Sequence, residues 1–214
     1  KNKNITLLRN KPLIYYTIKE AKKSKLLCNY IVSTDSLNIK KVCQKYKANV
    51  PFLRPKKYSN DNSSSASALK HALIECEKIY KKKFHYIVEL MATNPLKLSL
   101  DIDNIINLLI RNKADSVIAV NQLFDHHPAR IKKIKNGKLS DFVIKEKLES
   151  RRQDLKPNAY IRSGSIYGMS RKFVMSEKRY VSNVSLPYIL PSDRSINIDD
   201  KYDLLLAKIK LNEK

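Results

Sequence analysis

The chain has 214 residues, 43% of them hydrophobic, which suits one domain with a substantial core. No run reaches the roughly 20 apolar residues of a membrane span and no secretory signal opens the chain, so a membrane protein is disfavoured and a cytoplasmic location is expected. The 43 basic and 20 acidic residues give a net charge of +23, which raises nucleic-acid binding as a hypothesis. The lysines are spread over nearly every segment, however, so a solvated basic surface, or a field that gathers small anions, is the favoured interpretation.

Helix and strand patterns alternate through the first half of the chain. Apolar residues at helical spacing after Pro12 predict an amphipathic helix over residues 12–23. Short apolar runs bounded by polar loops predict strands. The further expected elements are a strand at 30–32, a helix capped by Asp35 or Ser36, a strand at 49–53, a helix opening within 60–65, a strand from 87, a helix from 99 and a strand at 116–120. This alternation predicts an α/β fold with a doubly wound, mainly parallel sheet.

Polar loops follow several of these strands. The stretch 87–97 begins as an apolar strand and breaks into Met91-Ala92-Thr93-Asn94-Pro95, and Arg54 follows the strand at 49–53. In an open α/β sheet, ligands bind at the carboxyl ends of the strands. The serines at 63–65 open a helix whose free backbone N–H groups suit an anion, although a plain helix cap would need only one such residue. Together these loops predict a site for an anionic ligand.

The pattern changes after residue 124. Asn136-Gly137, between strand patterns at 129–134 and 138–143, is a strong hairpin signal. Because a lone hairpin is not stable in water, the inserted arm 124–158 is expected to contact a second subunit. The remaining expectations are strands at 160–169 and 186–190, a helix at 201–211 that buries Leu204, Leu205 and Ile209 with Tyr202 as a further candidate, and buried free thiols at Cys28, Cys43 and Cys76.

One part of a nucleotide-binding α/β fold has no counterpart in this pattern. The alternation starts with a loop and a helix, without a strand in front of them. The three glycines, Gly137, Gly164 and Gly168, do not form a phosphate-binding loop. We therefore expect a first strand and its phosphate loop to precede Lys1.

Eight short motifs, in order along nearly the whole chain, resemble those of the CMP-N-acylneuraminate cytidylyltransferases, which activate sialic acid and related nine-carbon keto-acid sugars. The motifs are Lys3-Asn4-Ile5, Lys11-Pro12-Leu13-Ile14, Ile31-Val32-Ser33-Thr34-Asp35, Phe52-Leu53-Arg54-Pro55, Thr93-Asn94-Pro95-Leu96, His126-His127-Pro128, Arg151-Arg152-Gln153-Asp154 and the stretch from Ile196 to Asp203. The resemblance implies one nucleotidyltransferase domain over residues 1–214. It also implies that the anomeric hydroxyl of the sugar attacks the α-phosphate of CTP, with Mg²⁺ as cofactor and pyrophosphate as leaving group.

The resemblance assigns roles to particular residues. The paired arginines Arg151 and Arg152 match the positions that supply the catalytic arginine, and a guanidinium suits a carboxylate or a phosphate. The other implied positions are Lys3, Asn4, Arg54, Ser63, Ser65 and Thr93 for the nucleotide, Met91, Asn94, Gln153, Ser163 and Tyr167 for the sugar, and Asp199 with Asn197 for the metal.

Two departures from the family pattern concern the sugar and the metal. Met91 stands where most members have a Gln that hydrogen-bonds substrate, and a thioether is only a weak acceptor. Asn197 stands where the family has the first carboxylate of Asp-Ile-Asp, so we expect a weaker Mg²⁺ site centred on Asp199.

The leading hypothesis is therefore a CTP-dependent enzyme that acts on a nine-carbon keto-acid sugar and forms a homodimer through residues 124–158. The alternatives are a sugar nucleotidyltransferase with another base or acceptor, a catalytically lapsed relative, and a nucleic-acid-binding module, although nucleic acid is not the expected partner. His126 and His127 are candidates for a catalytic base, and a structural role is the favoured interpretation.

Overall fold

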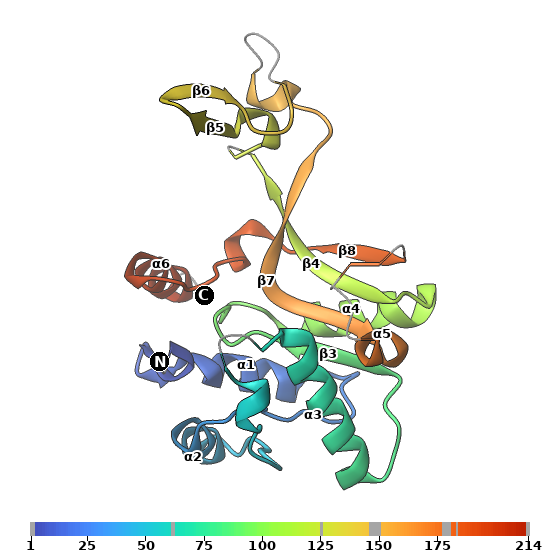
Figure 1. Ribbon diagram of the computed structural model, residues 1–214. Helices are drawn as coiled ribbons and strands as arrows, with labels where there is room; N and C mark the ends of the chain where they lie inside the picture. Colours follow the sequence, from blue (N-terminus) through green and yellow to red (C-terminus); the bar gives the residue numbers. More distant parts are fainter. Residues whose placement is uncertain are drawn as a thin grey trace.

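The computed structural model describes residues 3–60, 63–124, 126–145, 151–176, 181–182 and 184–212. A body of helices packed around a sheet carries an arm that projects from one end (Figure 1). The helices are α1 (Leu13–Lys23), α2 (Leu37–Lys45), α3 (Ser65–Tyr80), α4 (Ser99–Asn112), α5 (Arg171–Met175) and α6 (Lys201–Asn212). The strands are β1 (Leu7–Leu8), β2 (Lys11–Pro12), β3 (Tyr86–Leu90), β4 (Ser116–Leu123), β5 (Lys132–Lys135), β6 (Lys138–Asp141), β7 (Ala159–Ser170) and β8 (Ser185–Ile189).

The central sheet has the strand order β3-β7-β4-β8. Strand β4 runs parallel to β8, while β7 is antiparallel to both β3 and β4. Strands β3, β4 and β8 therefore share one direction, and β7 lies reversed among them. This arrangement confirms the predicted α/β fold with a mainly parallel sheet and adds one reversed strand that the sequence pattern did not indicate.

Helices cover both faces of this sheet. The apolar stripe of α4, including Ile102, Ile105 and Leu109, packs on one face, and Leu73 of α3 packs with Phe173 of α5 on the other. A Cβ at Gly168 in β7 would lie 2.5 Å from a methyl group of Ile105, so only glycine lets α4 approach the strand so closely.

The helices begin where the local sequence predicts. Pro12 precedes α1, and the Ser36 hydroxyl caps α2 by accepting from the Ile39 amide. Ser64 caps α3 in the same way, through the amide of Ser67. These caps satisfy backbone donors that have no partner inside the helix, which fixes each helix start.

The predicted strands at 30–32 and 49–53 are wrong as strands. Both segments are extended, but only isolated backbone bonds join them: the Val32 amide donates to Asn49 (2.8 Å), and the Arg54 amide to Thr34 (2.8 Å). A cavity of about 700 Å³ separates residues 30–33 from β3, and α1 and α3 also line it. Strand β3 is an edge of its sheet and pairs only with β7. Within the described residues, the edge of β3 that faces the cavity has no ladder partner, and neither does the segment 30–33.

Apolar side chains of α1 and α3, such as Ile18 and Leu73, line this cavity. The expectation of a strand ahead of Lys1 is not tested by the structure and stays a prediction.

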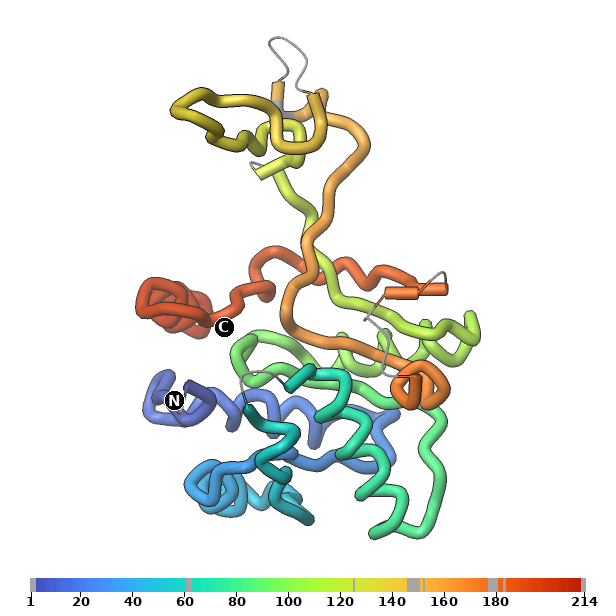
Figure 2. Tube along the Cα trace, viewed as in Figure 1, coloured from blue at the N-terminus to red at the C-terminus, as the bar shows by residue number. Residues whose placement is uncertain are grey.

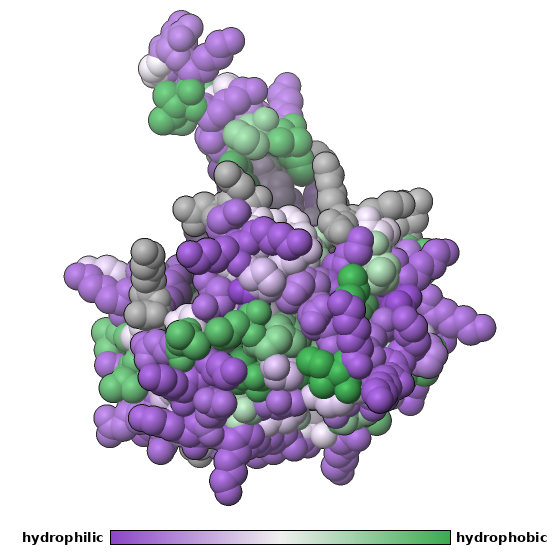
Figure 3. All heavy atoms as spheres, turned by 60° about the horizontal axis from the view of Figure 1, so that its bottom comes forward, coloured by the Kyte–Doolittle hydropathy of each residue, from purple (hydrophilic) through white to green (hydrophobic). Residues whose placement is uncertain are grey.

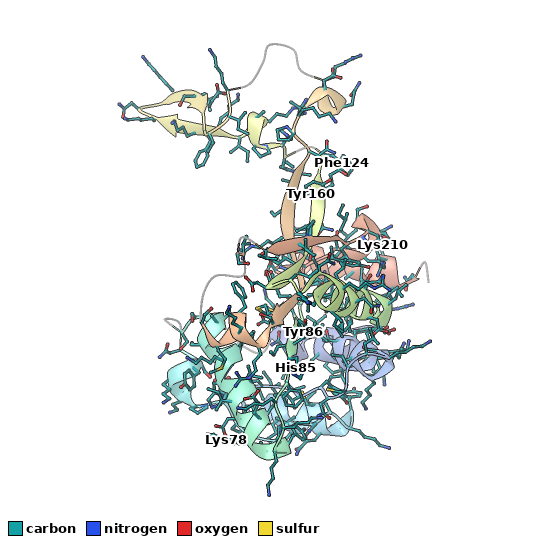
Figure 4. All side chains as sticks on the ribbon, turned by 90° about the vertical axis from the view of Figure 1, so that its right-hand side faces the viewer. Lys78, His85, Tyr86, Phe124, Tyr160 and Lys210 are labelled. Atoms are coloured by element: carbon teal, nitrogen blue, oxygen red, sulfur yellow. The ribbon has the colours of Figure 1, made fainter. Side chains whose placement is uncertain are left out.

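The arm carries the predicted hairpin. Strands β5 and β6 pair antiparallel around Asn136 and Gly137, whose φ angles of +52° and +72° suit a type I′ turn. Phe124 and Tyr160 lie on the narrow ribbon between body and arm (Figure 4). Apolar side chains stand exposed on the arm among hydrophilic ones (Figure 3), including Ile134 at 77% and Leu139 at 73% exposure.

Helix α6 buries part of the predicted face. Leu204 packs on the core as predicted, together with Ala207 and Leu211, against Leu8 and Leu13. The other predicted residues, Tyr202, Leu205 and Ile209, are exposed. The core-facing side of this helix is set by its contacts with β1 and α1, which periodicity within α6 cannot reveal.

The three cysteines differ in exposure. Cys43 and Cys76 are buried free thiols as predicted, but Cys28 is exposed. Across the part of the chain that the structure describes, no helix has the length and apolar character needed to cross a membrane.

Candidate active site

Segments from both ends of the chain meet beside the loop that follows β3. The Met91 amide donates to the Ser165 carbonyl in β7 (3.0 Å), and the Ile198 amide donates to the Thr93 carbonyl (2.8 Å). The ends of the described chain also lie on the same side of the body (Figure 2). The fold thus assembles the loop 91–94, a bend of β7 and the segment 196–199 at the carboxyl end of β3.

A charged cluster stands at this junction. The Lys3 ammonium contacts one carboxylate oxygen of Asp199 (2.9 Å), and the Asn197 amide nitrogen donates to the other (2.7 Å). The Asp199 side chain is 69% exposed and that of Lys3 44%, so both are open to a ligand. Water screens such a pair strongly, so it contributes little to stability.

A bulge in β7 makes room for this cluster. The pairing register between β4 and β7 shifts between Ile118 and Val120, and Gly164 in that stretch has a φ of +65°. A Cβ there would come 3.6 Å from the side-chain amide carbon of Asn197. That spacing is ordinary van der Waals contact, so it is the positive φ of the bend, and not the packing of Asn197, that favours glycine here.

Several predicted site residues share the cavity beside β3. Four residues predicted for the nucleotide line it, namely Asn4, Arg54, Ser65 and Thr93, and so does Met91, which was predicted for the sugar. Ser65 is the first residue of α3, where backbone donors and the helix dipole favour an anion.

Arg54 is held in place from two sides. Its Nε donates to the Ser59 hydroxyl (2.9 Å), and its guanidinium lies 3.9 Å from the Asp35 carboxylate. These contacts orient the guanidinium and leave further N–H donors for a ligand.

Other predicted residues are engaged elsewhere. The Ser63 hydroxyl donates to the Lys57 carbonyl (2.9 Å), and that of Ser163 accepts from the Ser165 amide (3.2 Å). Tyr167 is packed in the core against α3 and α5, and its role in sugar binding stays a prediction. Asn94 is fully buried, and both polar atoms of its side chain lack a partner among the described residues.

The predicted catalytic arginines lie on the arm. Arg151 is exposed and pairs with Asp154 (2.8 Å), and Gln153 sits in the short 3₁₀ helix Arg152–Asp154. The Arg152 backbone belongs to that helix, while its side chain lies outside the described part. This helix is far from the first residues in Figure 1, so one chain alone does not bring Arg151 and Gln153 to Lys3.

His127 has a structural environment. It is 3% exposed, its Nδ1 accepts from the Ala129 amide (3.2 Å), and its Nε2 bonds to the Pro157 carbonyl (2.9 Å). Both ring nitrogens are therefore used, which fits the structural interpretation and not that of a free base.

The predicted metal pair has suitable donor atoms. The Oδ1 of Asn197 is buried without a hydrogen-bond partner within the described residues, and the amide nitrogen of the same side chain donates to the Asp199 carboxylate. Clusters of three or more His, Cys, Asp or Glu side chains are absent from those residues. One carboxylate with one amide oxygen fits Mg²⁺, which takes few protein ligands and completes its shell with water and substrate phosphates.

Two buried charged residues escaped the sequence analysis. Lys97 is 1% exposed beneath the loop 91–94, and burial lowers its pKa to about 7. Asp101 is fully buried, accepts from Tyr188 (2.8 Å) and pairs with Arg194, which leads into the segment 196–199. For Lys97, the available sequence signal was a lysine between two leucines just before a helix. For Asp101, no local signal exists, because its partner Arg194 is distant in sequence.

Comparisons with known proteins agree with this geometry. A family model described as cytidylyltransferase matches residues 1–192. Relatives include the pseudaminic acid cytidylyltransferase of Campylobacter jejuni, 30% identical over 97% of this chain and 88% of that protein. The N-acylneuraminate cytidylyltransferase of Escherichia coli is 29% identical over 97% of this chain and 48% of its own length.

Solved structures show the same fold. A CMP-2-keto-3-deoxy-manno-octonic acid synthetase complexed with CTP superposes with a TM-score of 0.68 at 13% identity, over 99% of this chain and 92% of that one. The loop after β3 and the opening of α3 lie within the matched residues 1–192, while the segment 196–199 follows them. The chain belongs to the cytidylyltransferase family.

Proposed function

We propose that the protein transfers CMP from CTP to the anomeric hydroxyl of a nonulosonic acid, such as a sialic, legionaminic or pseudaminic acid, with release of pyrophosphate. The observation that carries this proposal is the convergence of Lys3, Thr93, Asn197 and Asp199, with Arg54 and Ser65 on the adjoining cavity. The relatives' names supply the sugar class. The proposal places the enzyme in the cytoplasm, where CTP is available.

The chemistry follows from the charges at the site. The sugar oxygen bonds to the α-phosphorus, its proton is lost to solvent, and the bond to the leaving pyrophosphate breaks. Catalysis of such a displacement is mostly positional and electrostatic, so cations must surround the phosphates. Lys3 and Arg54 provide such cations, and the start of α3 adds oriented N–H groups.

Asp199 and Asn197 would hold Mg²⁺, which neutralises phosphate charge when it is bound. The Lys3 ammonium contacts the same carboxylate, so it neutralises Asp199 until the metal arrives. The amide of Asn197 contributes no charge, which supports the expectation of a weaker metal site than a pair of carboxylates would give.

The arm supplies the remaining part of the proposal. Its exposed Ile134 and Leu139 suit burial against a second copy, and a homodimer would bring Arg151 and Gln153 of one copy to the cavity of the other. A guanidinium arriving in this way would pair with the sugar carboxylate. A related sugar nucleotidyltransferase with another base or acceptor is the second candidate, because Met91 on the cavity replaces a hydrogen-bonding Gln.

Pyrophosphate release tests the proposal. The purified protein, given Mg²⁺ and each of CTP, UTP and GTP, is assayed with sialic, legionaminic, pseudaminic and eight-carbon octulosonic acids. We expect turnover with CTP and a nine-carbon acid, and at least a tenfold lower rate for Lys3→Met but not for Lys19→Met, an exposed lysine of α1. Turnover only with UTP or GTP would favour the second candidate, and no turnover with any pair would contradict both.

A further inference from the structure

Lys97, between β3 and α4, is a buried amine that the proposed chemistry does not use. Its ammonium donates to the Met91 carbonyl (2.6 Å), to the Asn94 carbonyl and to the Thr17 hydroxyl (3.1 Å). A lysine has three N–H donors, so these three acceptors satisfy it fully. Burying an amine costs free energy unless its donors are hydrogen-bonded. The three bonds made by Lys97 therefore indicate that the side chain has a specific role at this position.

The nearest carboxylates are committed to other partners. Glu20 accepts from the Ser99 amide (3.0 Å), and Asp101 accepts from the Leu98 amide (2.8 Å) and from Arg194. Both act on Lys97 only through their field, which raises its pKa against the larger lowering by burial. Lys97 is therefore bonded to a loop and not paired in a salt bridge.

The bonded loop leads directly to the candidate site. The two carbonyls that Lys97 holds bracket Thr93, and the Thr93 carbonyl accepts from the Ile198 amide (2.8 Å). Ile198 stands between Asn197 and Asp199, the two residues that would hold the metal. The path from Lys97 to the metal ligands thus runs through one loop and one backbone hydrogen bond.

We propose that Lys97 is a positioning residue, which fixes the loop 91–94 so that Thr93 holds the segment carrying Asn197 and Asp199 in the geometry needed for transfer. The proposal rests on the proposed function. Lys97 itself is enclosed by protein and contacts no substrate. Its effect is on the placement of the metal ligands, which predicts a change in rate and in metal dependence more than in folding.

The test compares Lys97→Met with the unaltered protein. Methionine has a similar length without donors, so it keeps the volume of the side chain but leaves the Met91 and Asn94 carbonyls without their donor, at a moderate cost in stability. We expect a folded protein with a moderately lower melting temperature, at least a tenfold lower kcat, a higher Mg²⁺ concentration for half-maximal rate, and faster hydrogen exchange of the Ile198 amide. The matched control is Lys22→Met, which removes an exposed lysine that donates to the Tyr46 carbonyl (2.8 Å).

Each outcome decides the question. Unaltered kcat, metal dependence and Ile198 exchange in a folded Lys97→Met protein would overturn the proposal. If that variant does not fold, Thr17→Val removes only one of the three acceptors; we expect a severalfold lower kcat and faster Ile198 exchange, and unchanged values would overturn it. Hydrogen exchange needs no turnover, so it tests Lys97 even if no sugar acid proves to be a substrate and the proposed function fails.

Discussion

Asn197 provides an uncharged amide at the candidate metal site, where a second carboxylate would add negative charge. Its Oδ1 lacks a partner among the described residues, and its nitrogen bonds to Asp199 (2.7 Å). Replacing the amide by a second carboxylate adds a charged oxygen ligand, so Asn197→Asp is expected to lower the Mg²⁺ concentration for half-maximal pyrophosphate release about tenfold. Asn112→Asp, on the exposed end of α4, is the control. A metal dependence that does not change would show that residue 197 does not hold the ion.

Individual site residues differ in how far the sequence predicts them. Lys3 and Asp199 are 196 positions apart, and only the ordered motifs of a family resemblance connect them before the structure is known. Lys97 was missed because its one sequence signal, a lysine between leucines just before a helix, does not by itself show that the side chain is buried. The sugar-site role of Tyr167 rests on the family resemblance alone, because alternation along β7 does not tell the core face from the ligand face.

At the scale of elements, Glu77 ties α3 to α5. Its carboxylate accepts two bonds from Arg171 (2.7 and 2.9 Å), one from Lys83 (3.0 Å) and one from the Phe84 amide (3.3 Å). The bond from Arg171 is the main cause that lowers the pKa of Glu77 to about 2. Glu77→Gln is expected to reduce the free energy of unfolding by about 2 kcal/mol, as measured by urea denaturation.

The same carboxylate predicts acid sensitivity. Its folded pKa lies below the ordinary value of 4.5, so its contribution is present above pH 4.5 and is lost as the pH falls toward 2. The difference in stability between the native protein and Glu77→Gln should therefore shrink between these values. A difference that stays constant down to pH 2 would contradict this assignment.

Local signals account for the elements that were predicted well. Pro12, Ser36 and Asn136-Gly137 act through neighbouring backbone atoms, so the helix starts and the hairpin could be read from the sequence. The reversed direction of β7 and the absence of strands at 30–32 and 49–53 depend on distant pairing partners. Periodicity cannot supply that information.

At the scale of the whole molecule, the arm exposes large apolar side chains to solvent. Replacing both Ile134 and Leu139 by Glu would place charges on the surface proposed to meet a second copy. We expect this variant to be monomeric in light scattering and to lose most of its turnover, because Arg151 would no longer reach a neighbouring cavity. The control is Leu100→Glu, at an exposed position of α4. An unchanged mass would remove the arm from the subunit interface.

The central claim is that one triphosphate is held between Arg54 beside β3 and the Lys3–Asp199 cluster. Calorimetric titration of CTP into the purified protein, with and without Mg²⁺, tests it most directly when Arg54→Met and Lys3→Met are compared with Lys19→Met. The account predicts at least tenfold weaker CTP binding for the first two variants, native affinity for the third, and tighter binding with the metal. Equal CTP affinity in all three variants would contradict it.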